Sequence, residues 1–135
     1  MITDATGVPL ASTVTGGNRH DVTQLIPLVE AIPAIRGRAG RPRDRPRYLL
    51  ADRACDHNRY RRQLSLRQIT PVIARRGHPH GSGLGTQRWP VERTICWLHQ
   101  FRRLRTRWER KADLHQAFLT LACSIICLRK LRESF

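Results

Sequence analysis

Two acidic residues stand where a carboxylate could do chemistry, and Asp52 is the first of them. It follows the apolar run in "RYLLADRACD" (residues 47–56), and such a short run is typical of a buried strand. Open α/β sheets place their chemistry at the carboxyl ends of their strands. Taken alone, Asp52 is better explained as a helix cap or as an ion-pair partner of Arg53.

Glu92 is the second candidate, and it lies 40 residues further along the chain. It begins a predicted helix in "RWPVERTICWLHQFRRLRTRWE". On one continuous helix Glu92 shares a face with Cys96, His99 and Arg103, because these positions follow i, i+4, i+7 and i+11. The alternative is that Glu92 only stabilises the helix start, where the dipole favours an acid.

The charge of the chain indicates a polyanionic partner. Its 135 residues include 25 basic and 10 acidic side chains, a formal net charge of +15, and nearly all the basic ones are arginines. Arginine binds phosphate in a planar, bidentate way, so nucleic acid is the natural partner. The alternative explanation of the arginine content is a genome of biased base composition.

Acidic side chains that face nucleic acid would repel it unless divalent cations lay between them. Two Mg²⁺ ions held by carboxylates can clamp a phosphodiester in this way.

Hydrophobic periodicity predicts an α/β domain in which strands alternate with helices. A capping box of Asp21 and Gln24 is expected at the start of the first helix, and Pro27 should kink that helix or delay its start. Residues 36–47, "RGRAGRPRDRPR", are predicted to form a basic loop that is either solvated or in contact with DNA. The strands are expected near 8–15, 47–52 and 70–74 in one sheet, with helices near 22–32, 57–67, 91–104 and 112–131.

The cysteines and histidines do not predict a metal site. No C-x-x-C pair is present, so the cysteines are expected to be free thiols in a reducing compartment. His78 and His80 lack a neighbouring cysteine or acid and are interpreted as loop histidines. The four cysteines are Cys55, Cys96, Cys123 and Cys127.

The apolar segment 117–128 is shorter than the roughly 20 residues of a membrane span, so membrane insertion is not expected.

Three segments together resemble a known family. They are "TGGNRHDVTQLIPLVEAI", "LLADRACD" and "RWPVERTICWLHQFRRLRTRWERKADLHQAFLTLACSIICLRKL". In order and spacing they resemble the C-terminal part of a bacterial insertion-sequence transposase of the DDE class. The resemblance implies a ribonuclease H-like fold in which two aspartates and a glutamate hold two Mg²⁺ (or Mn²⁺) ions. It matches Asp52 to the second aspartate and Glu92 to the glutamate, so both would be catalytic metal ligands.

The chain departs from the family pattern in ways that bear on its activity. The family signature has Tyr, Arg, Glu and Lys, and here Gly85 and His99 stand at the Tyr and Lys positions while Arg88 fits. Pro90 is expected to keep Trp89 out of the helix. The family's first aspartate has no counterpart. This predicts one partial catalytic domain over residues 1–135, which lacks the first strand of the fold and binds metal weakly.

The implied activity is metal-assisted DNA cleavage and strand transfer, but we expect this chain to bind duplex DNA without cutting it. Further partners would be a second copy of the chain or a missing N-terminal half, and the location would be the bacterial cytoplasm at the nucleoid. The alternatives are a non-enzymatic remnant that interferes with intact transposase and a small RNA-binding protein, which the paired acids argue against. The candidate DNA contacts are Arg88, His99, Arg102, Arg103 and Arg105.

Overall fold

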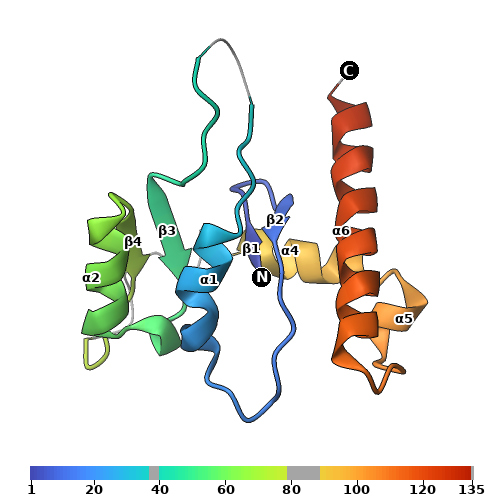
Figure 1. Ribbon diagram of the computed structural model, residues 1–135, viewed down its shortest axis with the longest axis horizontal. Helices are drawn as coiled ribbons and strands as arrows, with labels where there is room; N and C mark the ends of the chain where they lie inside the picture. Colours follow the sequence, from blue (N-terminus) through green and yellow to red (C-terminus); the bar gives the residue numbers. More distant parts are fainter. Residues whose placement is uncertain (37–39, 79–88, 135) are drawn as a thin grey trace. The chain divides into compact units, whose positions relative to one another are not determined.

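The computed structural model describes residues 1–36, 40–78 and 89–134, and it consists of two compact units (Figure 1). Unit 1 is built from the two ends of the chain, Met1–Gly17 and Trp89–Phe135. Unit 2 is the intervening segment, Asn18–Arg88. Asp52 therefore belongs to unit 2 and Glu92 to unit 1.

Unit 2 is organised around a parallel pair of strands. β3 and β4 are joined through α2, because parallel strands need a crossover connection. In the register of the pair Tyr48 lies opposite Thr70 and Ala51 opposite Ile73. The elements of the unit are η1 (Asp21–Gln24), α1 (Leu25–Glu30), β3 (Tyr48–Ala51), η2 (Arg53–Cys55), α2 (Asn58–Leu66) and β4 (Thr70–Ile73).

The core of unit 2 forms where α2 packs against both α1 and β4. Leu64 on α2 and Ile69 just before β4 are almost completely buried. On β3 only Leu49 is buried, whereas Tyr48 and Leu50 are exposed. The strand predicted as buried is therefore buried on one face only, as its alternation requires.

The start of the first helix differs from the predicted capping box. A 3₁₀ turn, η1, comes first, and no side-chain hydrogen bond caps it, so the capping box of Asp21 and Gln24 is wrong. The α-helix begins at Leu25, and Pro27 falls in its first turn. N–H groups in the first turn have no acceptor within the helix, so the N–H that proline lacks costs no hydrogen bond there. The delayed start predicted from Pro27 is confirmed.

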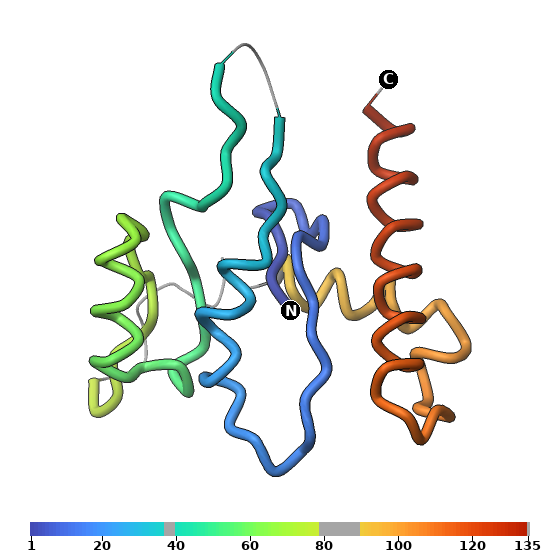
Figure 2. Tube along the Cα trace, viewed as in Figure 1, coloured from blue at the N-terminus to red at the C-terminus, as the bar shows by residue number. Residues whose placement is uncertain are grey.

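A long connection between α1 and β3 carries the basic loop (Figure 2). Within the described residues its backbone forms an isolated antiparallel bridge between Ile35 and Arg43, and at its end the Arg47 carbonyl accepts from the N–H of Thr70. Apart from that bridge the described part of residues 36–47 has no regular element, so the loop prediction is confirmed there.

Unit 1 combines a short hairpin with three helices. β1 (Ile2–Thr3) and β2 (Pro9–Ala11) pair antiparallel, and the Asp4 carboxylate accepts hydrogen bonds from two backbone N–H groups of the connecting turn. The helices are α4 (Trp89–Leu98), α5 (Arg102–Arg105) and α6 (Ala112–Glu133), and Figure 1 shows α5 next to α6. Their core contains Leu98 from α4 and Ala122 and Ile126 from α6.

The helix predicted over 91–104 is two helices. α4 ends at Leu98, and Phe101 adopts an extended conformation before α5 begins. His99 and Arg103 therefore do not share a helix face with Glu92. The expectation about Trp89 is also wrong: α4 includes Trp89, because Pro90 lies in the first helical turn and so costs no hydrogen bond.

Several apolar residues of these helices are exposed. On α4 the buried residues are Pro90, Thr94 and Leu98, while Val91 and Ile95 are exposed. On α6 four leucines are exposed: Leu114, Leu121, Leu128 and Leu131. By length and composition alone, α6 also meets the criteria for a membrane-spanning helix, which for one helix is a weak indication.

The sheet arrangement differs from the single sheet predicted. Within the described residues, β1 pairs with β2 in unit 1 and β3 with β4 in unit 2. The mixed α/β class is confirmed, since both units contain strands and helices. The incomplete ribonuclease H-like fold remains a prediction.

Candidate metal-binding and DNA-binding site

Asp52 occupies the position predicted for it, directly after a strand. β3 ends at Ala51, Asp52 continues in an extended conformation, and η2 begins at Arg53. The Asp52 side chain is exposed and forms no capping hydrogen bond to η2, although its position is that of an N-cap. The helix-cap explanation therefore does not account for this carboxylate.

The turn after Asp52 is closed by hydrogen bonds of its own backbone. The N–H of Cys55 donates to the carbonyl of Asp52 at 2.8 Å, and the N–H of Asp56 donates to the carbonyl of Arg53 at 3.0 Å. Residues Asp52 to Asp56 thus form a compact bend at the carboxyl end of β3.

Asp56 connects that bend to the end of β4. Its Oδ1 accepts from Arg61 Nε at 2.6 Å, and its Oδ2 accepts from the backbone N–H of Arg76 at 2.7 Å. These two hydrogen bonds, the Arg76 N–H first, hold the pKa of the Asp56 carboxyl below its usual value. Asp56 is the second acid of the same segment, but the sequence pattern alone does not identify it as part of the site.

Glu92 lies in the first turn of α4, where its side chain is exposed. The next turn of the helix is fixed from inside unit 1, because the Thr94 hydroxyl is buried and can donate to the carbonyl of Gly7 or of Pro90. Gly7 has φ +90°, and a Cβ there would lie 3.0 Å from the Pro90 carbonyl oxygen. The hairpin of unit 1 therefore packs closely against the helix that carries Glu92.

The structure does not test the pairing of the two acids. Asp52 and Glu92 belong to different units, so their joint role as metal ligands remains a prediction. Among the described residues no three histidine, cysteine or acidic side chains gather in a way that could hold a metal ion. The four cysteines form no disulfide bonds, and burial raises the pKa of Cys123 and Cys127.

The arginines predicted to contact DNA fall on and around α5. Arg102, Arg103 and Arg105 are exposed. Arg103 is already engaged, because its Nη1 donates to Glu109 Oε1 at 2.6 Å and its guanidinium lies 5.1 Å from the centre of the Phe118 ring. The hydrogen bond from Arg103 holds the pKa of the nearly buried Glu109 below its usual value. Of these three arginines, Arg103 is thus the least available to phosphate.

The other two candidates give different results. His99 is exposed and follows the end of α4, with its N–H donating to the carbonyl of Ile95 at 2.9 Å. Arg88 lies outside the described residues, as do His80 and Gly85.

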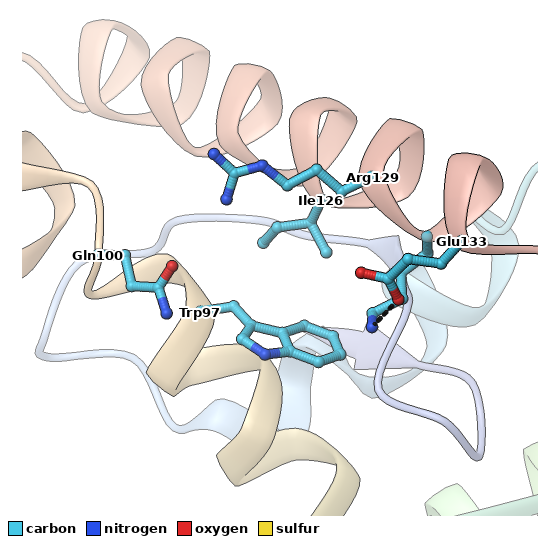
Figure 3. Close-up of a pocket in the computed structure, with 6 residues that line it drawn as sticks. Trp97, Gln100, Ile126, Arg129 and Glu133 are labelled. Carbon is cyan, nitrogen blue, oxygen red and sulfur yellow. Dashed lines mark hydrogen bonds and ion pairs between the residues drawn. The ribbon is translucent and has the colours of Figure 1, made fainter.

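Two cations lie around Trp97, a cluster that the sequence pattern did not predict. Lys130 Nζ lies 4.8 Å from the centre of the indole ring and the Arg93 guanidinium carbon 5.9 Å from it. Beside this ring a small cavity of about 150 Å³ opens between α4 and α6 (Figure 3). Neither predicted metal ligand lines it. Its lining residues are Trp97, Gln100, Ile126, Arg129, Lys130 and Glu133.

Comparison with known proteins identifies the family. The family described as Transposase DDE domain matches residues 1–127. This chain belongs to the transposase DDE domain family. A relative from Burkholderia cepacia, described as a putative transposase for insertion sequence element IS402, is 58% identical over 134 residues. The alignment covers 99% of this chain and 64% of the relative. No solved structure matches the chain.

Members of the transposase DDE family generally depend on divalent metal ions. The two candidate ligands suit such an ion, because exposed carboxylate oxygens are the donors that Mg²⁺ prefers. The half-buried thiols Cys123 and Cys127 are poor ligands in comparison, since a thiol must lose its proton to bind a metal and burial opposes that loss.

Proposed function

We propose that this chain contributes a catalytic acid pair, Asp52 and Glu92, to transposition of DNA. The observation that carries the proposal is the position of Asp52. Its exposed carboxylate follows β3 at the end where β3 pairs in parallel with β4, and this is the edge at which open α/β sheets bind ligands. Membership of the transposase DDE family supplies the reaction class.

In this proposal Asp52 and Glu92 would hold the divalent ions, which neutralise phosphate charge and activate the attacking oxygen when bound. The carboxylates would act on the reacting phosphodiester only through those ions, and the arginines proposed to contact DNA would hold the flanking phosphates. DNA cleavage would be followed by attack of the freed 3′-hydroxyl on target DNA, as the resemblance to DDE transposases implies.

We further propose that these 135 residues bind DNA without cutting it. The family uses three acids, and the first aspartate has no counterpart among the residues that match its motifs. With Asp52 and Glu92 as the only proposed carboxylate ligands, this chain would hold divalent ions weakly. The alternative is a non-enzymatic remnant that binds DNA and interferes with intact transposase.

The DNA-binding surface in this proposal includes His99 and the arginines of α5. Arg102 and Arg105 should contact phosphate more strongly than Arg103, because Arg103 is held by Glu109. The bacterial nucleoid is the location that such binding implies. Self-association of the chain remains a prediction.

A plasmid-nicking assay with Mg²⁺ or Mn²⁺, run beside a DNA-binding titration, tests the proposal. We expect duplex binding whose affinity falls steeply with salt, and whose salt slope decreases by about one for each phosphate-contacting arginine replaced by alanine. We expect no nicking by the wild-type chain. Nicking that is abolished by both Asp52→Asn and Glu92→Gln would show that the site is complete, and an absence of DNA binding would refute the proposal altogether.

A further inference from the structure

We propose that Asp56 is a positioning residue, which holds the bend after Asp52 and so fixes the direction of the Asp52 carboxylate. This inference rests on the proposed role of Asp52 as a metal ligand. Asp56 itself would touch neither metal nor DNA. Its role would follow from what its two carboxylate oxygens hold.

The first oxygen of Asp56 orients Arg61 of α2. Arg61 Nε donates to Asp56 Oδ1 at 2.6 Å, and Arg61 Nη2 donates to the carbonyl of Ile73 at 2.7 Å. One guanidinium thus joins the bend after β3 to the last residue of β4. The planar fork of arginine allows both bonds at once, which a lysine ammonium does not reproduce.

The second oxygen of Asp56 fixes the chain that leaves β4. It accepts from the backbone N–H of Arg76 at 2.7 Å. The Arg76 side chain then returns to the bend, where its Nη2 donates to the carbonyl of Ala54 at 2.9 Å. A closed set of bonds therefore surrounds η2, the three residues that directly follow Asp52.

The burial of the Asp56–Arg61 pair distinguishes it from an ordinary surface ion pair. The side chains of Asp56 and Arg61 are only 10% and 15% exposed. Exposed pairs contribute little because water and salt screen them, whereas a shielded pair whose oxygens are all occupied is rigid. A metal ligand must be held to within about half an ångström, and a rigid neighbour of this kind supplies that constraint.

Manganese binding by the full chain tests the inference, with Asp52→Asn identifying the part of the binding that depends on Asp52. We expect Asp56→Asn to weaken Asp52-dependent Mn²⁺ binding by about 10- to 100-fold, as the loss of partners that orient metal ligands does elsewhere. Arg61→Lys should give a similar loss, because it keeps the charge but not the fork. Glu30→Gln is the matched control: it breaks an exposed ion pair with Arg67 in the same unit. It should leave Mn²⁺ affinity unchanged.

Amide hydrogen exchange gives a second readout that does not need metal. The Cys55 N–H closes the bend onto Asp52, so its exchange should quicken by about tenfold or more in Asp56→Asn and stay unchanged in Glu30→Gln. Arg76→Met should quicken it too, and as the replacement of an exposed residue it leaves the core of unit 2 intact.

The two readouts separate failure of this inference from failure of the proposed function. If the wild-type chain shows no Asp52-dependent Mn²⁺ binding, the metal-ligand role fails, and Cys55 exchange still decides whether Asp56 holds the bend. If wild-type binding depends on Asp52 but folded Asp56→Asn, Arg61→Lys and Arg76→Met retain it, the positioning role is refuted while the proposed function stands.

Discussion

The two units hold their candidate ligands by different means. Unit 2 places Asp52 at a strand end, and the bend beyond it is tied by charged side chains from α2 and from the chain after β4. Unit 1 places Glu92 on a helix, and the support comes from a buried hydroxyl, Thr94, against the backbone of a glycine turn. One candidate ligand precedes a bend that an ion pair and hydrogen bonds hold, and the other lies on a helix held by close packing against a backbone turn.

The cores of the two units also differ in the kind of side chain that they bury. Unit 2 contains most of the buried apolar residues, with Leu64 and Ile69 almost completely buried, and its polar network lies at one end of the strands. In unit 1 the completely buried side chain of α4 is that of Thr94, and the apolar cluster lies further along at Leu98, Ala122 and Ile126. We therefore expect truncation of a buried apolar side chain to lower the stability of unit 2 most, and loss of a buried hydroxyl to lower the stability of unit 1.

The largest effect is expected from Leu64→Ala in unit 2. The side chain is 0% exposed, so its truncation should lower the free energy of unfolding by about 2–5 kcal/mol through lost burial and a residual cavity. Circular dichroism would follow both units during urea unfolding, whereas tryptophan fluorescence reports unit 1 alone, since Trp89, Trp97 and Trp108 all belong to it. A destabilisation seen equally by both signals would show that the units unfold together.

A smaller effect is expected from Thr94→Val in unit 1. The shapes are nearly the same, but the valine leaves the buried Gly7 carbonyl without its donor, which should cost about 1–3 kcal/mol. Thr94→Ser keeps the hydroxyl, so it should retain the hydrogen bond and destabilise unit 1 less than Thr94→Val does. The midpoint of urea unfolding by tryptophan fluorescence measures both. If valine proves no worse than serine, then packing rather than the hydroxyl holds α4 to the hairpin.

The sequence predicted unit 2 better than unit 1 for a physical reason. In unit 2 the predicted strands at 47–52 and 70–74 and the helix at 57–67 are confirmed to within a residue at each end. Each is a short apolar or amphipathic run bounded by charged or turn residues, so periodicity alone determines it. The same segment contains Asp52, whose position after a strand was therefore predictable.

In unit 1 the helical periodicity predicted neither the end of α4 nor the burial of Thr94. The run from Val91 to Leu104 fits a single amphipathic helix, but α4 ends at Leu98 and α5 begins after Phe101. The Phe101 ring lies under Arg129 of α6 and packs against the apolar cluster. That break depends on contacts between residues far apart in sequence, which a helical pattern does not contain. The burial of Thr94 was equally hidden, because it depends on Gly7, a residue 87 positions away.

Asp56 shows a third limit of the sequence pattern. Its spacing from Asp52 marked it as a second acid in one segment, but its partners Arg61 and Arg76 are two among many arginines. In a chain with 25 basic residues the pattern does not select which ones pair. Only the crossover from β3 through α2 to β4 brings these two guanidinium groups to the bend.

The smallest expected effect is the loss of folding stability at low pH, to which one carboxylate in each unit should contribute. The pKa of Asp56 is lowered from its ordinary 3.8 by the Arg76 N–H and by Arg61, and that of Glu109 from 4.5 by Arg103. A carboxyl whose folded pKa is depressed stabilises the fold above its unfolded pKa, and the stabilisation is lost as the pH falls through the folded value. Unit 2 should therefore weaken below about pH 3.8 and unit 1 below about pH 4.5.

Exchange of the two carboxylates for amides separates these contributions. Asp56→Asn should flatten the acid side of the pH profile of urea midpoints measured by circular dichroism, and leave the tryptophan profile of unit 1 unchanged. Glu109→Gln should flatten the tryptophan profile instead, because Glu109 and all three tryptophans belong to unit 1. If either substitution flattens both profiles equally, the acid response belongs to the whole chain, and the ion pairs of the two units are not independent supports.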